Sequence, residues 1–352
     1  MTFQHAENSK IDISTLKEIN APKWDAYVNN HKSGSFFHLA GWRRVIERTL
    51  RQPAHYLQAE QHGQIVGILP LVEVRSPIFG NALVSTGFTV GGGLLCDNQR
   101  IESRLLRAAE RLMHGYALDR IELRGGINAR AGWLAKSDLY ASFVRPMEPT
   151  IEANLARLRK RQRATVRRGL KFDFAISIEQ DAEKFLPLYA ESLHRHGTPM
   201  LPWNYYRALL EEFGDACDVI IVSDGGAPLG AMINFYYQGT VMPYYSGTLA
   251  RARDFSIYDL MCFELMRHAL ETKGCTVFDM GRSKAGTGSY DFKRHWGFEP
   301  EPLTYHFCLR PGDTIPEINP LNPNYQRKIA LWRKTPAPII NRLGPWLARQ
   351  LG

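Results

Sequence analysis

The stretch GRSKAGTGSYDFKRHWGFEP at 281–300 gathers residue types that could carry out chemistry. Three glycines at 281, 286 and 288 are followed by Tyr290, Asp291 and Lys293. Glycines near a lysine can let backbone N–H groups wrap a phosphate, but the P-loop requires Gly-Lys-Ser/Thr, which is absent here. We therefore expect the glycines to turn the chain between a strand and a helix. That interpretation leaves Lys293 as the residue to test.

A second chemical feature is the basic run ARLRKRQRATVRRGLK at 156–171, which holds eight cations and no anion between 157 and 171. Apolar residues recur at helical spacing and predict one amphipathic helix with its cations outward; they are Ile151, Leu155, Leu158, Val166 and Leu170. Dense like charges repel, so phosphate binding is one interpretation and a solvated face is the other. The candidate phosphate ligands are Arg161, Arg163, Arg167 and Arg168.

Composition limits the class of protein. The chain has 352 residues, 44% of them hydrophobic and 22% charged, as in globular proteins. A net charge of +9 favours anionic partners. Five cysteines without CxxC spacing argue against a disulfide framework or a zinc site, and we expect no metal.

Localisation follows from the apolar segments. No apolar run reaches the roughly 18 residues of a membrane span, and the N-terminus lacks the apolar core of a signal peptide, so we expect a cytoplasmic protein. The basic tail at 325–352, with Trp332 and Trp346, could rest on the inner membrane as a peripheral anchor or pack on the body of the protein.

The elements that must position these residues occur twice. The segments 55–74 and 218–237 each predict a strand, a glycine turn and a strand, and 105–126 and 262–282 each predict a helix followed by a strand. This order predicts an α/β (α+β) fold of two tandem domains, each a mixed sheet flanked by helices. We expect domains at 1–148 and 149–310, then a Pro/Asn-rich linker and basic tail at 311–352.

The second half resembles the GNAT acyltransferase fold. Helix 256–273, strand TVFDM, short helix and turn YDFKRHWGF, and strand PLTYHFCLR follow the order of that fold. In GNAT enzymes a glycine-containing loop that binds pyrophosphate precedes the long helix, whereas LARARDFSIYDL here has no glycine. GGG at 91–93 in the first half lacks the arginine spacing. The resemblance therefore disfavours coenzyme A.

Two GNAT-like halves, the second without that loop, resemble the Fem family of aminoacyl (peptidyl) transferases. The motifs are similar to those of FemAB-related proteins associated with PEP-CTERM and exopolysaccharide systems. They cover most of 35–310 and include FFHLAGW, ESLHRHGTPMLPWNYYRALLEEFG, YYSGT and FDMGRSKAGTGSYDFKRHWGFEPEPLTY. Cell-wall Fem ligases usually carry a long coiled-coil arm linked to tRNA handling, for which no segment here is long enough. The activated donor thus stays open between aminoacyl-tRNA and acyl-CoA, with no bound cofactor expected.

The resemblance implies attack of an amine or hydroxyl on an activated carbonyl. Lys293 would then support the oxyanion that develops. A base is also needed, for which HRHGTP at 194–199 and the side chains of Asp291, Tyr244, Tyr245 and Tyr290 are candidates. His194 and His196 stand two apart and face different sides of a helix, so they make a poor metal pair. We expect catalytic roles for Lys293, Asp291 and Tyr245, and substrate binding by His196, Thr198, Tyr244, Ser246, Arg282 and Tyr290.

The function we expect is an acyl or aminoacyl (peptidyl) transferase that forms an amide on a cell-envelope precursor, such as a carrier-linked sugar or peptide of peptidoglycan or exopolysaccharide. One alternative is a GNAT N-acyltransferase that uses acyl-CoA or an acyl carrier. Another is an RNA-binding or non-catalytic scaffold protein, which the basic run permits but no RNA-recognition motif supports.

Overall fold

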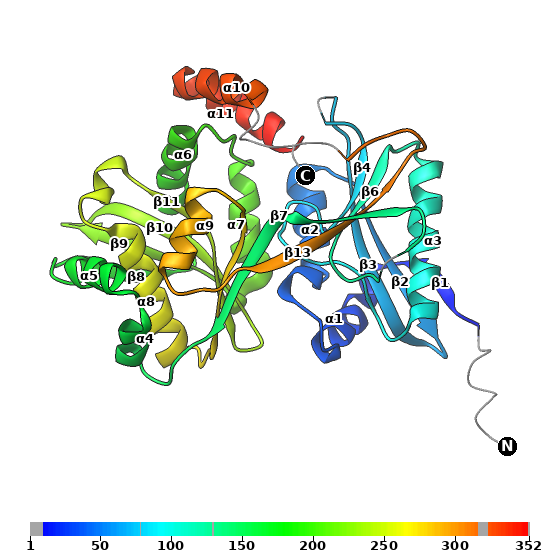
Figure 1. The fold of residues 1–352 in the computed structure, drawn as a ribbon, viewed down its shortest axis with the longest axis horizontal. Coiled ribbons are helices and arrows are strands. Elements are labelled where there is room, and N and C mark those ends of the chain that lie inside the picture. The colour runs from blue at the N-terminus through cyan, green and yellow to red at the C-terminus, as the bar shows by residue number, and fades with distance from the viewer. Residues whose placement is uncertain (1–9, 78, 129, 316–322, 351–352) are drawn as a thin grey trace. The chain divides into compact units, whose positions relative to one another are not determined.

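The computed structural model describes residues 10–77, 79–128, 130–315 and 323–350. The chain forms two compact units (Figure 1). Unit 1 is built from Met1–Ser137, Thr304–Ile318 and Arg349–Gly352, and unit 2 from Asp138–Leu303 and Asn319–Ala348.

Unit 1 is a mixed sheet with helices. Its strands run in the order β1-β2-β3-β4-β6-β13, with β5 beside β3. Antiparallel pairing joins β2 to β3 and β3 to β4, whereas β4 and β6 are parallel. The elements are β1 (Asp12–Thr15), α1 (Ala21–Asn30), α2 (Gly41–Leu50), β2 (Ala54–Gln61), β3 (Gln64–Val74), β4 (Ala82–Ser85), β5 (Leu95–Cys96), α3 (Gln99–Gly115), β6 (Arg120–Arg124), the first part of β7 (Trp133–Pro146) and most of β13 (Glu301–Leu309).

The core of unit 1 forms where α3 lies on the sheet. Asn98 caps α3 by accepting the N–H groups of Arg100 and Ile101. Close approach to the sheet requires a glycine, because a Cβ at Gly67 would lie 2.5 Å from the Ile101 side chain and 3.0 Å from Leu105. The apolar face of α3 is buried against β2 and β3, and this burial stabilises the unit.

Unit 2 repeats this plan with more helices. Its strands run in the order β7-β12-β11-β10-β9-β8, and only β11 and β12 are parallel among the pairs described. The elements are α4 (Ile151–Arg157), α5 (Lys160–Gly169), β8 (Ala175–Glu179), α6 (Phe185–His196), α7 (Trp203–Phe213), β9 (Cys217–Asp224), β10 (Ala227–Tyr237), β11 (Thr240–Thr248), α8 (Ile257–Glu271), β12 (Val277–Lys284), α9 (Gly288–His295), α10 (Pro323–Lys334) and α11 (Ala337–Ala348).

Two glycines show which helices cover which face of the unit 2 sheet. A Cβ at Gly230 of β10 would meet Ile257 and Met261 of α8, and one at Gly247 of β11 would meet the Tyr189 backbone of α6. Because Gly230 pairs with Thr248 rather than with Gly247, these two glycines face opposite sides. Helices α4, α5 and α9 pack on the α8 side. The tyrosines of α7 join α6 on the other side.

The expected fold class is confirmed. Both predicted hairpins form, as β2–β3 and β9–β10, and each is followed by a third strand, a long helix and a strand parallel to the third. The expected division at 148/149 and 310/311 differs from the two units, since the chain changes unit inside β7 and again inside β13. A strand can continue through a boundary because its two ends hydrogen-bond to different neighbours.

The single amphipathic helix expected over 157–171 is wrong. The chain forms α4 and α5 with a break at Leu158 and Arg159, whose backbones are extended or outside the helical region. The break allows Leu158 to be buried in the core beside Val166, whereas Leu170 stays exposed. Much of the expected linker, residues 316–322, lies outside the described residues.

Candidate active site

The candidate site lies where two parallel strands of unit 2 part. Strands β11 and β12 pair at Thr240↔Val277 and Val241↔Phe278, near their first residues, and they form no further pair along the rest of their described lengths. On its other edge β12 pairs with β7, with a register shift between Asp279 and Arg282. Gly281 in this bulge has φ +67°, a conformation that favours glycine. Beyond Phe278, the backbone carbonyls of β12 that face β11 have no strand partner there, so they need other hydrogen-bond donors.

Lys293 supplies hydrogen-bond donors to those carbonyls. Thr287 starts α9 by capping the N–H of Tyr290 at 3.4 Å, and Lys293 follows in the last turn. Its Nζ donates to the carbonyl oxygens of Arg282 at 2.9 Å and Gly281 at 3.2 Å. The residue is only 9% exposed, and Nζ lies 5.3 Å from the Phe143 ring centroid. A primary ammonium has three N–H donors, so one remains for a ligand.

Burial changes the acid–base properties of this lysine. Loss of solvent lowers the pKa of Lys293 to about 8, while the nearby Asp279 carboxylate opposes the shift. Burial also raises the pKa of Asp279, against the effects of Lys293 and of the Gly281 N–H, which donates to Oδ1 at 2.7 Å. Lys293 is thus a mostly charged donor at neutral pH in a poorly solvated position. A developing oxyanion is stabilised more strongly in such a position than in water.

Two other predicted site residues, Arg282 and Tyr290, pack against aromatic rings of β7, the strand whose Phe143 ring also lies near Lys293. The Arg282 guanidinium lies 4.5 Å from the centroid of Tyr140, and Tyr290 packs edge-on against Phe143 at 5.2 Å. The structure therefore brings Arg282, Tyr290 and Lys293 to one region of β7, β12 and α9. Asp291 lies on the exposed side of α9.

The predicted residues of β11 divide between the two faces of the sheet. Tyr245 packs against Tyr189, Tyr205 and Tyr206, and its hydroxyl lies 3.1 Å from that of Tyr205. Burial raises the pKa of Tyr245, so its hydroxyl stays protonated at neutral pH. Ser246 faces the opposite way, towards the Tyr258 hydroxyl of α8.

Tyr244, just before these two residues, lies at an irregularity in the pairing of β10 with β11. The pairing of β10 with β11 shifts register between Ile233 and Asn234, which leaves Tyr244 out of the ladder. Its ring packs against Phe235 at 5.0 Å. The bulge changes which face each β11 side chain takes, an effect that no sequence pattern predicts.

His196 and Thr198 lie among the tail helices. Gly197, at φ +76°, ends α6, and the His196 Nδ1–H donates to the Ser192 carbonyl oxygen at 2.6 Å. The His196 carbonyl accepts a hydrogen bond from Arg333 of α10 at 3.2 Å. Thr198 is exposed and lines a small cavity with Ile340 of α11. Neither residue is among the contacts of Lys293.

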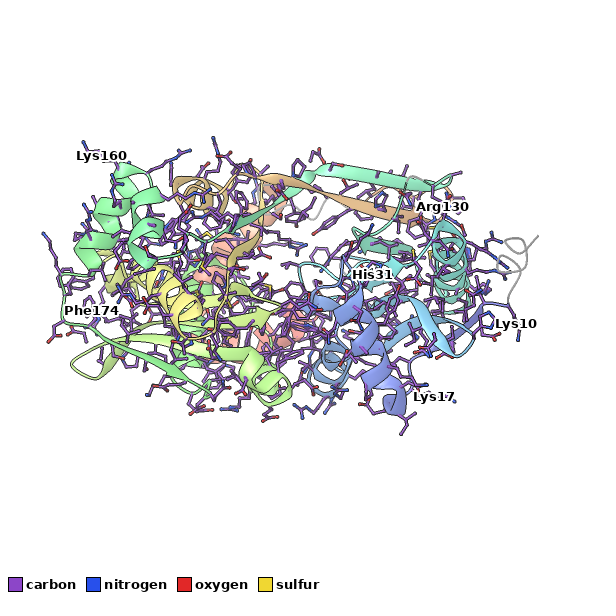
Figure 2. All side chains as sticks on the ribbon, turned by 90° about the horizontal axis from the view of Figure 1, so that it is seen from below. Lys10, Lys17, His31, Arg130, Lys160 and Phe174 are labelled. Carbon is purple, nitrogen blue, oxygen red and sulfur yellow. The ribbon has the colours of Figure 1, made fainter. Side chains whose placement is uncertain are left out.

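The four candidate arginines of α5 are not equivalent. Arg163 donates to the Ala156 carbonyl at 2.7 Å, and Arg168 donates to the Ser256 hydroxyl, so both help to hold the fold. Arg161 and Arg167 are exposed. Lys160, at the start of the same helix, lies at the periphery of unit 2 in Figure 2. Only part of the cationic face is thus available to a phosphate.

A cavity of about 280 Å³ opens beside α5. Its lining includes Arg159, Arg161, Asp259, Phe292 and His295. Asp259 accepts a hydrogen bond from the Trp296 indole at 2.9 Å and another from Gln162. Burial raises the pKa of Asp259 to about 6, and the Trp296 bond and Arg168 oppose the shift. A polyanion could bind at the arginines, with Phe292 as an apolar wall.

The segment before α8 has the backbone hydrogen bonds of a closed turn. Ala250–Arg253 forms a 3₁₀ turn, and the N–H groups of Asp254, Phe255 and Ser256 donate to Arg251, Ala252 and Arg253. Amides that donate within a turn cannot also surround a pyrophosphate. This geometry agrees with the absence of glycine from the segment.

The sequence reasoning missed Asp279, Asp259 and Tyr258. Asp279 interrupts the otherwise apolar strand VFDM, which is a detectable signal. Asp259 and Tyr258 stand in the first turn of α8, where acidic and polar residues are ordinary, so their placement depended on the fold.

Comparisons with known proteins show which folds this chain resembles. Residues 153–294 match the model of the Acetyltransferase (GNAT) domain. No curated protein sequence matches the chain. The crystal structure of FemX is similar, with 14% identity, a TM-score of 0.68, and coverage of 92% of this chain and 100% of that one.

Two further solved structures share the fold. L-PGS from Bacillus licheniformis is 12% identical with a TM-score of 0.56, over 89% of this chain and 96% of that one. A tandem GNAT protein from the clavulanic acid biosynthesis pathway is 11% identical with a TM-score of 0.55, over 86% and 100%. At these identities the likeness shows the fold. Together with the matched domain model, it indicates that the chain is an acyltransferase built on the GNAT fold.

Proposed function

We propose that the protein is an acyl or aminoacyl (peptidyl) transferase that forms an amide on a carrier-linked cell-envelope precursor. The matched GNAT model supports acyl transfer, and the structural likeness to FemX and L-PGS supports an aminoacyl donor. We also propose that the acceptor is a precursor of exopolysaccharide or peptidoglycan and that the protein acts in the cytoplasm. The exposed arginines of α5 suit a phosphate-bearing substrate.

The observation that carries the proposal is the placement of Lys293. In the reaction, the acceptor amine attacks the donor carbonyl and a C–N bond forms as the carbonyl oxygen becomes an oxyanion. The remaining N–H of Lys293 would donate to that oxygen, since the other two are held by Gly281 and Arg282. The C–O bond to the donor then breaks, the leaving oxygen takes a proton, and the amine loses one.

Proton transfer would use a tyrosine hydroxyl and a carboxylate. We propose Tyr245, whose hydroxyl is bonded to that of Tyr205, as the group that donates a proton to the leaving oxygen. Asp291 is the carboxylate that we propose to accept the amine proton. Arg282, Tyr290, Ser246, Tyr244, His196 and Thr198 are the proposed substrate contacts.

The closed turn before α8 favours an aminoacyl-tRNA over acyl-CoA as donor. The N–H groups of Asp254, Phe255 and Ser256 donate to the carbonyls of Arg251, Ala252 and Arg253 and are not free for a pyrophosphate. The phosphates of a tRNA can be bound by side chains, for which Arg161 and Arg167 are available. Acyl-CoA transfer is the second candidate, because the matched model is an acetyltransferase domain.

A thermal-shift and transfer panel tests the proposal. The ligands are acetyl-CoA, bulk aminoacyl-tRNA, deacylated tRNA and UDP-linked amino sugars, each with wild type, Lys293→Met and the exposed-site control Lys23→Met. A ligand at a hundredfold excess over Kd stabilises by about 2.7 kcal/mol. We expect aminoacyl-tRNA to stabilise the protein and to transfer its aminoacyl group, with transfer lost in Lys293→Met alone.

Other outcomes separate the alternatives. Stabilisation and acetyl transfer with acetyl-CoA alone would show an acyl-CoA enzyme. Equal stabilisation by charged and deacylated tRNA with no transfer to any acceptor would indicate an RNA-binding protein. Retention of full transfer by Lys293→Met would exclude the oxyanion role of this lysine.

A further inference from the structure

Exposed apolar side chains gather on the two C-terminal helices of unit 2. Leu331 of α10 is 70% exposed, and α11 exposes Ile339 (47%), Leu343 (47%) and Trp346 (51%). Residues at i, i+4 and i+7 of a helix lie within an arc of about 60°, so the three α11 residues form one stripe. Monomeric soluble proteins rarely expose apolar side chains in such a group.

The opposite sides of these helices attach them to the protein. On α11, Ile340 and Ala348 are buried, and Gly344 lies against the backbone of Met200. On α10, Ile329 packs against Gly197. The helices therefore do not use their exposed stripe for docking. This packing confirms that the tail rests on the body of unit 2, and it also leaves an apolar face outward.

The charge around the outward face has one sign. Residues 323–350 contain no Asp or Glu. Exposed cations accompany the apolar residues on both helices: Arg327, Lys328, Arg333, Lys334 and Arg342. By helical spacing, Arg327 and Lys334 share the outward face of α10 with Leu331. Apolar side chains, a tryptophan and cations without acids match the surface of an anionic bilayer, where the rings enter the interface and the cations meet lipid phosphates.

We propose that the outward face of α10 and α11 docks the protein on an anionic lipid bilayer. The helices lie on the membrane and do not cross it; within the described part of the chain, no helix combines the length and the apolarity that a membrane span needs. A second copy of the chain is a poorer occupant, because self-association through this face would bring its cations together. The docking requires no transferase activity and is independent of the proposed function.

Vesicle co-sedimentation tests the proposal. The vesicles are phosphatidylcholine alone and equal parts phosphatidylcholine and phosphatidylglycerol. Wild type should bind the anionic vesicles at least about tenfold more tightly, and the preference should fall as salt is raised. The triple variant Ile339→Ser, Leu343→Ser, Trp346→Ser should lose about tenfold or more in affinity. Lys334→Glu should lose roughly fivefold or more.

The matched control is Ile176→Ser, Ile178→Ser, which removes two exposed isoleucines of β8 in the same unit. It should bind vesicles like wild type. Circular dichroism of each variant checks that it is folded. Failure of wild type to bind either vesicle, or unchanged binding by the triple variant, would overturn the proposal. So would sedimentation velocity that shows a wild-type dimer lost in the triple variant together with no lipid preference.

Discussion

The environment of Lys293 predicts how its removal changes stability with pH. A lysine whose pKa falls from 10.5 in the unfolded chain to about 8 in the folded protein costs about 3 kcal/mol of folding free energy at neutral pH. The folded pKa is the lower one, so this cost is complete below pH 8. As pH rises from 8 towards 10.5 the unfolded chain holds more protons, and the native state gains relative stability.

Lys293→Met removes both the cost and the hydrogen bonds. The carbonyls of Gly281 and Arg282 lose their donors, which costs about 1–3 kcal/mol for each group that stays unsatisfied. At pH 7 the two effects oppose each other: the two lost hydrogen bonds cost about 2–6 kcal/mol together and removal of the buried charge returns about 3, so the net destabilisation of the variant should not exceed about 3 kcal/mol. By pH 9.5 only wild type has gained from deprotonation, so the gap should widen by about 2 kcal/mol.

Urea unfolding followed by tryptophan fluorescence near pH 7, 8, 9 and 9.5 measures the gap. The control is Lys23→Met, which removes an exposed lysine of α1 and should keep a constant difference from wild type. A gap for Lys293→Met that does not widen above pH 8 would refute the claim that Nζ is desolvated. In the same window, transfer by wild type should fall as the ammonium deprotonates, because the proposed role needs its charge.

Three further predictions concern unit 2. Gly247→Ala should destabilise by about 1–3 kcal/mol in urea unfolding, because its Cβ would lie 2.4 Å from the α6 backbone, whereas Gly288→Ala, with no atom within 4 Å, should not. The pKa of Asp259 is raised to about 6 in the folded protein, so wild type should lose stability as pH rises from about 4 to 6 and the carboxyl group ionises. Asp259→Asn should remove this loss, and equal profiles of Tm against pH for the two proteins would contradict the prediction. Arg161→Gln and Arg167→Gln should each lower the salt dependence of tRNA binding by about one in log–log slope, and unchanged slopes would place the phosphates elsewhere.

Local pattern was enough to predict much of the fold. The turn glycines Gly63 and Gly226 lie between strands as expected, and both have positive φ. The long helix α8 and the short helix α9 also fall where the sequence placed them. Alternation and helical periodicity extend over only a few residues, so strands and helices can be predicted from them without knowing which distant segments they contact.

The misses share a cause in long-range packing. The break at Leu158 follows no glycine or proline; it occurs because that side chain is buried beside Val166 in a core built from distant segments. The boundary between the two units falls inside β7 and inside β13 because the two ends of each strand pair with different neighbouring strands. The contacts of His196 and Thr198 with α10 and α11 likewise depend on where the C-terminal helices pack.

By itself, the sequence determined the elements, their order, the duplication and the lysine on the short helix before Gly-Phe. Only the tertiary structure decided that β11 and β12 part after two residue pairs and that the Lys293 amine meets the carbonyls exposed by the bulge in β12. It also decided that one face of the tail packs while the other stays exposed. The physical reason is that a side chain's burial, partners and pKa are set by groups far away in the chain, which no local pattern specifies.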